Sequence, residues 1–251
     1  MSEIVAGSWA TRLRTLTPAR VGLGRTGVSQ QTRNLLDFQQ AHALARDAVH
    51  ARLEAASLAA AIAEITGNEV LRLRSMAADR AVYLQRPDLG RQLDEASRAT
   101  LAAVQPKVVW DLAVVVADGL SALAVERHVP PLLREWLPRM EVWNVAPICV
   151  VEQGRVAIGD AIGEALGARL CAVLIGERPG LSSPDSLGAY ITWEPRQERT
   201  DAERNCISNI RREGLSYAQA EVQLSYYVNE ARSRKLTGIA LKEESKRIEK
   251  G

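Results

Sequence analysis

The chain has 251 residues, of which 47% are hydrophobic and 25% are charged, the composition of a globular protein with one large or two modest domains. Its 32 basic and 30 acidic residues leave a formal net charge of +2, so no strong overall field attracts nucleic acid or an anionic membrane. We see no signal peptide and no run of about 20 apolar residues, which predicts a cytoplasmic protein without a membrane span.

Cysteine and histidine are both scarce. Cys149, Cys171 and Cys206 are odd in number and lack CxxC spacing, and two of them lie inside apolar runs, as free thiols do. None of the three histidines belongs to an HxxxH, HExxH or mixed Cys/His cluster. We therefore expect reduced cysteines and no metal site.

Residues 1–105 are predicted to form a helical region. Apolar residues recur at helical spacing from residue 29 to residue 56, and an alanine-rich stretch continues the pattern to Gly67, where we expect the helix to end. Basic and acidic side chains are interspersed along it, which favours a protein interface over a nucleic-acid groove. We therefore expect this region to serve assembly.

A turn and a second helix are predicted next. Pro87 and Gly90 mark the turn, and the helical pattern then continues through residues 102 to 106. We see no convincing strand before residue 108, so we expect none there.

The pattern changes in residues 106–251, where short apolar runs alternate with helical segments. The runs LAVVVA, ICVV and LCAVLIG have no polar alternation, which predicts strands buried on both faces of a mostly parallel sheet covered by helices. A fourth run, LGAYITW, predicts another strand, and a long amphipathic helix is expected from about residue 215 to residue 236. The predicted fold class is α/β.

A parallel sheet also predicts where a ligand binds, because open α/β sheets hold ligands at the carboxyl ends of their strands. Asp118 and Ser121 follow the first apolar run, and Glu177 follows LCAVLIG. We expect Ser121 to cap a helix or bind a ligand, and Pro179–Gly180 to form a type II turn with its glycine at positive φ. Asp118, Glu177 and Asp185 could form an acid/base pair, although loop carboxylates are more commonly solvated.

The stretch GLGRTG, residues 22–27, matches the GxGxxG pattern of dinucleotide-binding proteins. The segment before it, RLRTLTPAR, is basic and contains a proline, whereas the fingerprint requires a buried strand there. We therefore interpret GLGRTG as a glycine-rich turn before the first long helix.

Cys206 lies in ERNCISNIRREG, where neighbouring arginines could lower the pKa of its thiol. The sequence shows no histidine paired with it as a base. We therefore interpret Cys206 as a packing or ligand-lining thiol and not as a nucleophile.

Five blocks of the sequence resemble one known family in their order and spacing. They are YLQRPDLGRQL (83–93), VVVADGLSALAV (114–125), GRVAIGDAIGEALGA (154–168), GERPGL (176–181) and CISNI (206–210). Together they closely resemble the small subunit of ethanolamine ammonia-lyase, from about residue 20 to residue 239. Five blocks in order are far more specific than any single motif above.

The resemblance implies a fold, a cofactor and a partner. Members of the family combine a helical N-terminal region with a Rossmann-like domain, here residues 1–105 and 106–251. They join a barrel-shaped large subunit in a hetero-oligomer that encloses adenosylcobalamin for the radical conversion of ethanolamine to acetaldehyde and ammonia. The large subunit binds ethanolamine, so this chain is expected to be the non-catalytic subunit of the lyase.

The family's cobalamin contacts fall on Val156, Glu177 and Cys206 of this chain. The resemblance implies backbone and apolar contact from Val156, a carboxylate that accepts hydrogen bonds from corrin amides at Glu177, and a small, weakly polar wall at Cys206. The expected location is the cytoplasm, with a bacterial microcompartment as the alternative. We do not see the long N-terminal extension that some members use for import into such a compartment.

Two other functions stay open. One is a stand-alone α/β nucleotide-binding enzyme that uses the same crevice, and the other is a scaffold that binds only protein. The enzyme would need a phosphate loop after the first strand and an acid/base pair with histidine, and neither is visible. Cobalamin absorbance and ammonia release, measured with and without the large subunit, distinguish the three functions.

Overall fold

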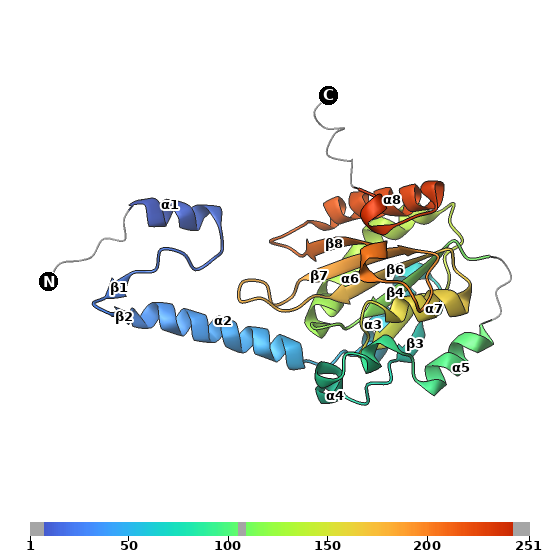
Figure 1. Ribbon diagram of the computed structural model, residues 1–251, viewed down its shortest axis with the longest axis horizontal. Helices are drawn as coiled ribbons and strands as arrows, with labels where there is room; N and C mark the ends of the chain where they lie inside the picture. The colour runs from blue at the N-terminus through green and yellow to red at the C-terminus, as the bar shows by residue number, and fades with distance from the viewer. Residues whose placement is uncertain (1–7, 105–108, 243–251) are drawn as a thin grey trace, which may run out of the picture.

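A six-stranded sheet forms the centre of the molecule (Figure 1). The computed structural model describes residues 8–104 and 109–242. The strand order is β3-β5-β4-β6-β7-β8, in which the first four strands are parallel and β7 and β8 are antiparallel. The bounds are β3 Leu71–Arg74, β4 Leu112–Ala117, β5 Cys149–Glu152, β6 Leu170–Gly176, β7 Leu187–Trp193 and β8 Arg204–Ile210. The predicted α/β class and mostly parallel sheet are confirmed, and the narrower Rossmann-like assignment stays a prediction.

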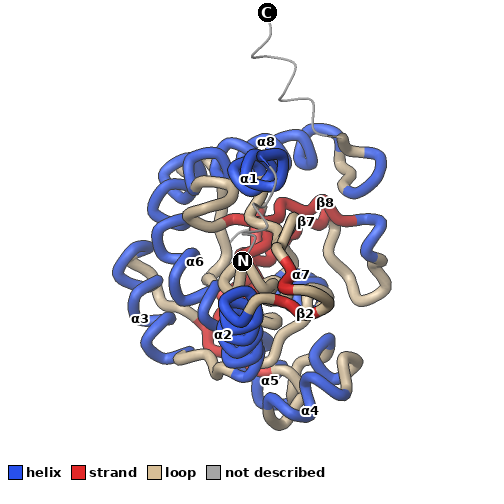
Figure 2. Tube along the Cα trace, turned by 90° about the vertical axis from the view of Figure 1, so that its left-hand side faces the viewer, coloured by secondary structure: helices blue, strands red, loops and turns tan. Residues whose placement is uncertain are grey.

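Helices cover both faces of the sheet, as the apolar runs predict. All side chains of β4 are buried: Val114 and Val116 pack into the core with α3, α6 and α8, whereas Val115 and Ala117 pack on the opposite face with α5 and α7. Figure 2 shows α3 and α6 together on one side of the strands. The bounds are α3 Ala55–Thr66, α5 Glu95–Ala103, α6 Ala122–Trp136, α7 Ile158–Leu166 and α8 Tyr217–Arg234. Among the described residues, no helix has the length and apolar character needed to cross a membrane.

β3 corrects the prediction that no strand precedes residue 108. It pairs in parallel with β5 at the edge of the sheet, with Leu71 opposite Cys149. Leu73 is buried, whereas Arg72 and Arg74 are exposed. A short edge strand with one wet face carries no continuous apolar run, so the pattern used for the central strands does not detect it.

Residues 8–50 form an arm that projects from the body of the molecule (Figure 1). In its long helix only Ala48 is buried, and Leu36 and Leu44 are 56% and 54% exposed. The arm contains α1 Ser8–Leu16, β1 Arg25–Thr26, β2 Ser29–Gln30 and α2 Thr32–His50. The glycine-rich turn is confirmed, since Gly27, with φ of 63°, lies between the antiparallel strands β1 and β2.

The helix predicted to run up to Gly67 is two helices. The chain leaves helical geometry between α2 and α3, where Leu53 is buried in the core and the Glu54 amide donates to the Glu126 carboxylate at 2.9 Å. No glycine or proline marks this break in the sequence, and Leu53 packs into the core at the point where the helix is interrupted. The predicted stop is confirmed, because Gly67 caps α3 with φ of 67°.

The predicted turn and second helix are present. A 3₁₀ turn at Leu89–Arg91 precedes α5, which ends at Ala103 with Val104 in extended geometry, so the helix is shorter than the predicted one, whose end at residue 106 lies outside the described residues. Asp94 caps α5 by accepting from the Ser97 amide at 2.8 Å, and Asp79 caps the short α4, Arg80–Gln85. The other 3₁₀ turns are Leu137–Met140, Asp201–Glu203 and Gly238–Ala240.

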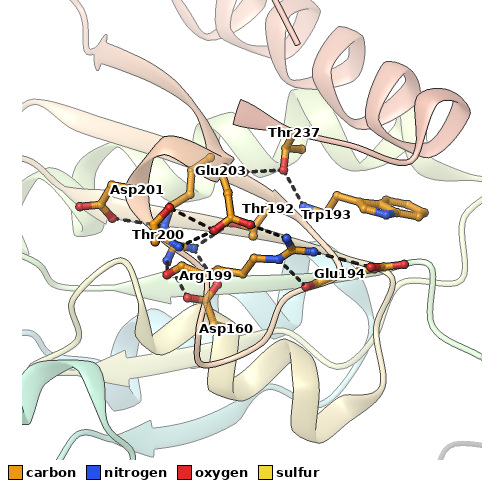
Figure 3. Close-up of polar contacts among 10 residues, drawn as sticks. Asp160, Thr192, Trp193, Glu194, Arg199, Thr200, Asp201, Glu203 and Thr237 are labelled. Atoms are coloured by element: carbon orange, nitrogen blue, oxygen red, sulfur yellow. Dashed lines mark hydrogen bonds and ion pairs between the residues drawn. The ribbon is translucent and has the colours of Figure 1, made fainter. Parts of the chain in front are cut away.

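The polar edge strand β8 was also not predicted, and a buried ion pair fastens it to the body. Arg204 donates from Nη1 and Nη2 to the two carboxylate oxygens of Asp160 on α7, both at 2.6 Å. It also donates to the Thr192 hydroxyl at 3.1 Å and to the Arg199 carbonyl at 3.0 Å. Figure 3 shows the surrounding network, in which Arg199 also pairs with Glu203 at 2.5 Å. This network fixes the strand that carries Cys206.

Candidate functional site

A cavity of about 440 Å³ opens at the carboxyl ends of β4 and β6, and we name it the strand-end cavity. Its lining comes from the end of β6 and the segments that follow β4, β5 and β6, together with α4 and β7. The lining residues are Tyr83, Gly119, Leu120, Arg155, Val156, Ile175, Gly176, Glu177, Arg178 and Tyr190. It lies where open α/β sheets hold ligands, which makes it the candidate site.

A larger cavity of about 910 Å³ lies at the opposite ends of the strands. Its lining includes Trp110, two residues before β4, and Ile148, directly before β5. Size alone would favour this cavity, but α/β sheets bind ligands at the other edge, where the loops after the strands converge. The five blocks of the resemblance also supply most of the strand-end lining and none of the larger cavity.

Two glycines form the floor of the strand-end cavity. Gly119 has φ of 55°, and a Cβ on it would overlap the Gly176 carbonyl oxygen. A Cβ on Gly176 would in turn overlap the Ser121 carbonyl oxygen. The Leu120 amide donates to the Gly176 carbonyl at 2.9 Å. The strand ends therefore meet backbone to backbone, without side chains in between.

Ser121 is confirmed as a helix cap. Its hydroxyl oxygen accepts from the Ala124 amide at 3.2 Å at the start of α6. The same hydroxyl donates to the Pro184 carbonyl at 3.0 Å, and the residue is fully buried. The Ser121 hydroxyl thus has both an acceptor and a donor inside the protein, and Ser121 supports the cavity from behind without lining it.

Asp118 is fully buried, so its interpretation as a solvated loop charge is wrong. Its Oδ1 accepts from the Gly154 amide at 3.0 Å, and its Oδ2 lies 3.6 Å from Nη1 of Arg80. Burial raises the pKa of Asp118 to about 6, against the opposing effect of the Arg80 charge. Arg80 also donates to the Gly119 carbonyl at 2.8 Å and to the Val49 carbonyl at 2.6 Å, so it joins the end of the arm to the cavity floor.

Tyr83 lies between two arginines at one side of the cavity. The Arg80 and Arg155 guanidinium carbons lie 4.8 and 4.2 Å from the centre of its ring. The Tyr83 hydroxyl donates to the Gly154 carbonyl at 3.2 Å, and burial raises the pKa of Tyr83, so it stays a protonated donor. Arg155 donates from Nη2 to the Tyr83 carbonyl at 3.3 Å.

Glu177 lines the cavity directly after β6, which is parallel to β4 as predicted. Its carboxylate accepts from the hydroxyl of Ser186, from that of Ser208 at 2.5 Å and from the Asn209 amide at 3.1 Å. No ion pair joins Glu177 to Arg178 within the described residues, so the carboxylate is held by neutral donors on β8 and on the segment before β7. These donors fix its orientation.

The expectation of a type II turn with Gly180 at positive φ is wrong. Gly180 is absent from the residues with positive φ in the described chain. Gly180 and Ser183 instead exchange two backbone hydrogen bonds, of 3.0 and 3.2 Å, around the turn between them. The fixed edge at Glu177 therefore comes from its carboxylate contacts and from its backbone bond to the Ser186 carbonyl, at 2.9 Å.

Of the other predicted site residues, Val156 lines the strand-end cavity and Cys206 lies beside it. Val156 is half-buried just before α7. Cys206 is exposed on β8, directly opposite Tyr190, which lines the cavity. Partial burial raises the pKa of Cys206, so the suggestion that arginines lower it is wrong, and the hydrogen bond with Tyr190 opposes the rise only in part.

The predicted carboxylate pair is not assembled. Asp118 and Glu177 have the separate partners described above, and Asp185 pairs with Arg127 at 2.9 Å. Within the described ranges, no group of three or more His, Cys, Asp or Glu side chains could hold a metal ion. The strand-end cavity is thus suited to binding and positioning, with an apolar wall and a few fixed polar groups.

Sequence reasoning missed Arg155, Tyr83 and Tyr190 as lining residues. Tyr83 and Arg155 lie 72 positions apart, and only the folded chain brings them together. A signal was present for two of them, because Tyr83 opens the first block of the resemblance and Arg155 lies in the third. Nothing in their local sequence indicates that they stack.

The comparisons with known proteins identify the family of the chain. The sequence model of the family described as "Ethanolamine ammonia-lyase light chain (EutC)" matches residues 8–242. The "Ethanolamine ammonia-lyase small subunit" of Pseudomonas paraeruginosa (strain DSM 24068 / PA7) is 57% identical over 239 residues, which cover 93% of this chain and 86% of that protein. The protein of the same name from Xanthomonas campestris pv. campestris is 57% identical over 246 residues, covering 96% and 89%.

A third relative of that name, from Pseudomonas syringae pv. tomato, is 56% identical over 245 residues, which cover 96% of this chain and 84% of the relative. The match includes the arm, the sheet and the strand-end cavity, because the family model begins at the first described residue of α1 and ends at the last described residue after α8. Because the family model matches residues 8–242 and these relatives share 56–57% identity across most of the chain, the chain belongs to the family of ethanolamine ammonia-lyase small subunits.

Proposed function

We propose that this chain covers one side of adenosylcobalamin with its strand-end cavity, as the small subunit of a cobalamin-dependent ethanolamine ammonia-lyase. The observation that carries the proposal is the meeting of Val156 and Glu177 in one cavity at the carboxyl ends of parallel strands. Cys206 lies one strand away, opposite the cavity residue Tyr190. These are the three positions on which the family's cobalamin contacts fall.

The residues present fit a corrin. The wall formed by Val156, Ile175 and Tyr190 is largely apolar, as the flat ring of a corrin requires, and Glu177 and two arginines provide polar groups for a rim of amides. Sites for drug-sized ligands are about 300–1,000 Å³ in volume. At about 440 Å³ the strand-end cavity is small for a cofactor as large as adenosylcobalamin. The rest of the enclosure is therefore assigned to the large subunit.

Each residue of the site has a positioning role. Val156 supplies apolar contact, and Glu177 supplies an acceptor whose orientation Ser186 and Ser208 hold. Cys206 supplies a thiol that stays protonated, because partial burial raises its pKa. When bound, adenosylcobalamin supplies radical chemistry through homolysis of its cobalt–carbon bond, for the conversion of ethanolamine to acetaldehyde and ammonia.

We assign ethanolamine binding to the large subunit and no catalytic residue to this chain. The lining of the strand-end cavity contains no histidine, lysine or cysteine in the described chain. Burial raises the pKa of both lining tyrosines, Tyr83 and Tyr190, which disfavours a role as general bases. The groups present orient a ligand and exclude water from it.

We also propose that residues 1–105 serve assembly, with the arm as their contact to the large subunit. Trp9 and Leu16 on α1 are 62% and 80% exposed, and Leu36 and Leu44 on α2 are more than half exposed. Apolar side chains gathered on an element outside the core are typical of protein interfaces. A cytoplasmic complex, with a microcompartment as the alternative location, belongs to the same proposal.

The decisive experiment is co-expression with the large subunit of the same lyase. We expect a stable complex that retains cobalamin, measured by its absorbance after gel filtration, and that releases ammonia from ethanolamine. The chain purified alone serves as the control and should release none. Ammonia release by the chain alone would contradict the assignment of catalysis to the large subunit, and a complex without cobalamin would contradict the role of the cavity.

A further inference from the structure

Arg155 is a half-buried arginine whose position is fixed on several sides. Its guanidinium carbon lies 4.2 Å from the centre of the Tyr83 ring, and its Nη2 donates to the Tyr83 carbonyl at 3.3 Å. Its own amide donates to the Gly90 carbonyl at 2.7 Å. A Cβ on Gly90 would lie 2.8 Å from Cγ of Arg155, so the glycine makes room for the arginine. The block YLQRPDLGRQL therefore serves as a support for Arg155.

The guanidinium of Arg155 retains donors that the protein does not use. Its Nε is buried without an acceptor, and its Nη1 makes no hydrogen bond with the described residues. No carboxylate of the described chain forms an ion pair with it. The contacts with Tyr83 bring no negative charge, and a partly buried cation is costly without a charged or hydrogen-bonding partner for its remaining donors. The strand-end cavity, which Arg155 lines, is the place for a ligand that supplies such a partner.

The charges of the cavity favour an anionic group. Arg155 and Arg178 line it, and neither forms an ion pair within the described part of the chain. The single carboxylate of the lining, Glu177, is occupied by donors from Ser186, Ser208 and the Asn209 amide. A ligand that brings one negative charge would thus meet two unpaired guanidinium groups.

We infer that Arg155 binds the phosphodiester of the cobalamin nucleotide tail, with Tyr83 and Gly90 as its positioning residues. The inference rests on the proposed function. The phosphodiester is the one anionic group of cobalamin, whose corrin side chains end in neutral amides. A fixed guanidinium with free N–H groups matches the geometry of phosphate oxygens. A contact with a corrin amide carbonyl is the competing outcome, and the test below separates the two.

The test compares two corrinoids on the complex with the large subunit. Cyanocobalamin carries the nucleotide tail, and dicyanocobinamide has the same corrin ring without the tail and its phosphodiester. Dissociation constants are measured by equilibrium dialysis with absorbance detection. We expect Arg155→Gln to weaken cyanocobalamin binding about ten- to a hundredfold and to leave dicyanocobinamide binding within about threefold. Arg155→Lys keeps the charge and should recover part of the loss.

Three controls keep the result interpretable. Arg98→Gln removes a positive charge from the exposed surface of α5 and should change neither constant. In Gly90→Ala the added methyl group would crowd the Arg155 side chain. This variant should weaken cyanocobalamin binding less than Arg155→Gln does, and should again leave dicyanocobinamide binding nearly unchanged. Salt should weaken cyanocobalamin binding in the wild-type complex more than in Arg155→Gln, because the variant lacks the charged contact. Co-purification with the large subunit confirms that each variant folds.

The outcomes are distinct. Equal binding of cyanocobalamin by wild type and Arg155→Gln, or equal salt dependence, overturns the inference and leaves the proposed function standing. Equal weakening of both corrinoids assigns Arg155 to the corrin ring and overturns the assignment to the phosphodiester. A wild-type complex that binds neither corrinoid overturns the proposed function itself.

Discussion

The arm and the body that contains the sheet differ in how far their apolar residues are buried. In the body, Trp136 and Leu112 are fully buried, whereas Leu16 and Val28 of the arm are 80% and 96% exposed. Ala10 and Ala48 are the buried apolar residues of the arm among those described. The body therefore contains the interactions that stabilise its own fold, whereas the apolar surface of the arm is free to stabilise a complex with another chain.

Deletion of residues 1–47 is the strongest test of this difference between the arm and the body. The deletion removes almost all of the exposed apolar surface of the arm and keeps Val49, whose carbonyl accepts from Arg80. We expect co-purification with the large subunit to be lost, while the melting temperature of the isolated body changes little. Pull-down with a tagged large subunit and thermal unfolding followed by circular dichroism measure the two effects.

A point variant provides the control for this deletion. Leu36→Asp places a charge on the exposed face of α2 and should weaken pairing without unfolding the body. Full pairing of the deleted chain would place the interface on the body and would contradict the assembly role of the arm.

The largest expected effect on stability lies in the body, at the buried pair between Arg204 and Asp160. Their side chains are 2% and 1% exposed, so Arg204→Met leaves a buried carboxylate without its partner. Removal of one member of such a pair costs about 3–5 kcal/mol, and the double variant Arg204→Met/Asp160→Leu should recover much of this loss. Urea unfolding measures both. Arg86→Met, at an exposed ion pair, is the matched control, and an equal effect of the two single variants would refute the role of burial.

A smaller effect is expected on the pH dependence of the free energy of unfolding, and it should arise at Asp118, next to the glycine floor of the cavity. Burial raises the pKa of Asp118 to about 6, whereas an unfolded aspartate has a pKa of about 3.9. Between about pH 3.9 and about pH 6, Asp118 is protonated more often in the folded state than in the unfolded state. The free energy of unfolding therefore falls as pH rises through this window, by at most about 3 kcal/mol. Asp118→Asn should remove that slope. Identical pH profiles of wild type and variant, from about pH 4 to about pH 7.5, would show that Asp118 does not titrate there.

Glu177→Gln should have the smallest of these effects. The amide keeps one acceptor but loses the charge that Ser186, Ser208 and the Asn209 amide stabilise, so we expect about tenfold weaker cobalamin binding. Turnover at saturating cofactor should stay close to that of the wild type. Cys206→Ala, on the neighbouring strand, is the control and should retain most of the turnover. Lost turnover with normal cofactor binding would assign Glu177 a catalytic role.

The sequence predicts the parts of the fold in which local pattern and tertiary environment agree. The run Leu170–Gly176 is apolar throughout because both faces of β6 are covered, and its carboxyl end places Glu177 as expected. β3 alternates apolar and polar residues, but its four residues are too few to stand out between helical segments, and β8 carries polar residues in place of an apolar run. Edge strands need information about their neighbours, which a single sequence pattern does not contain.

The candidate site follows the same rule. The blocks of the resemblance indicate Val156 and Glu177, and both line the cavity. The burial of Asp118 and the stacking of Arg155 on Tyr83 depend on residues brought together from more than 30 positions away. A charge that follows a strand looks solvated in sequence, and only the fold shows that Arg80 covers it.

The glycine floor of the strand-end cavity has a consequence for how this gene can change. Every missense substitution at the codon of Gly119 or Gly176 adds a Cβ, and at either position that atom overlaps a carbonyl oxygen of the opposite segment. Because the two segments press against each other, a change at one codon does not relieve the clash at the other. Neither position offers a neutral first step, so genetic drift has no single-mutation route through this part of the chain, and saturation mutagenesis should return glycine alone at both codons.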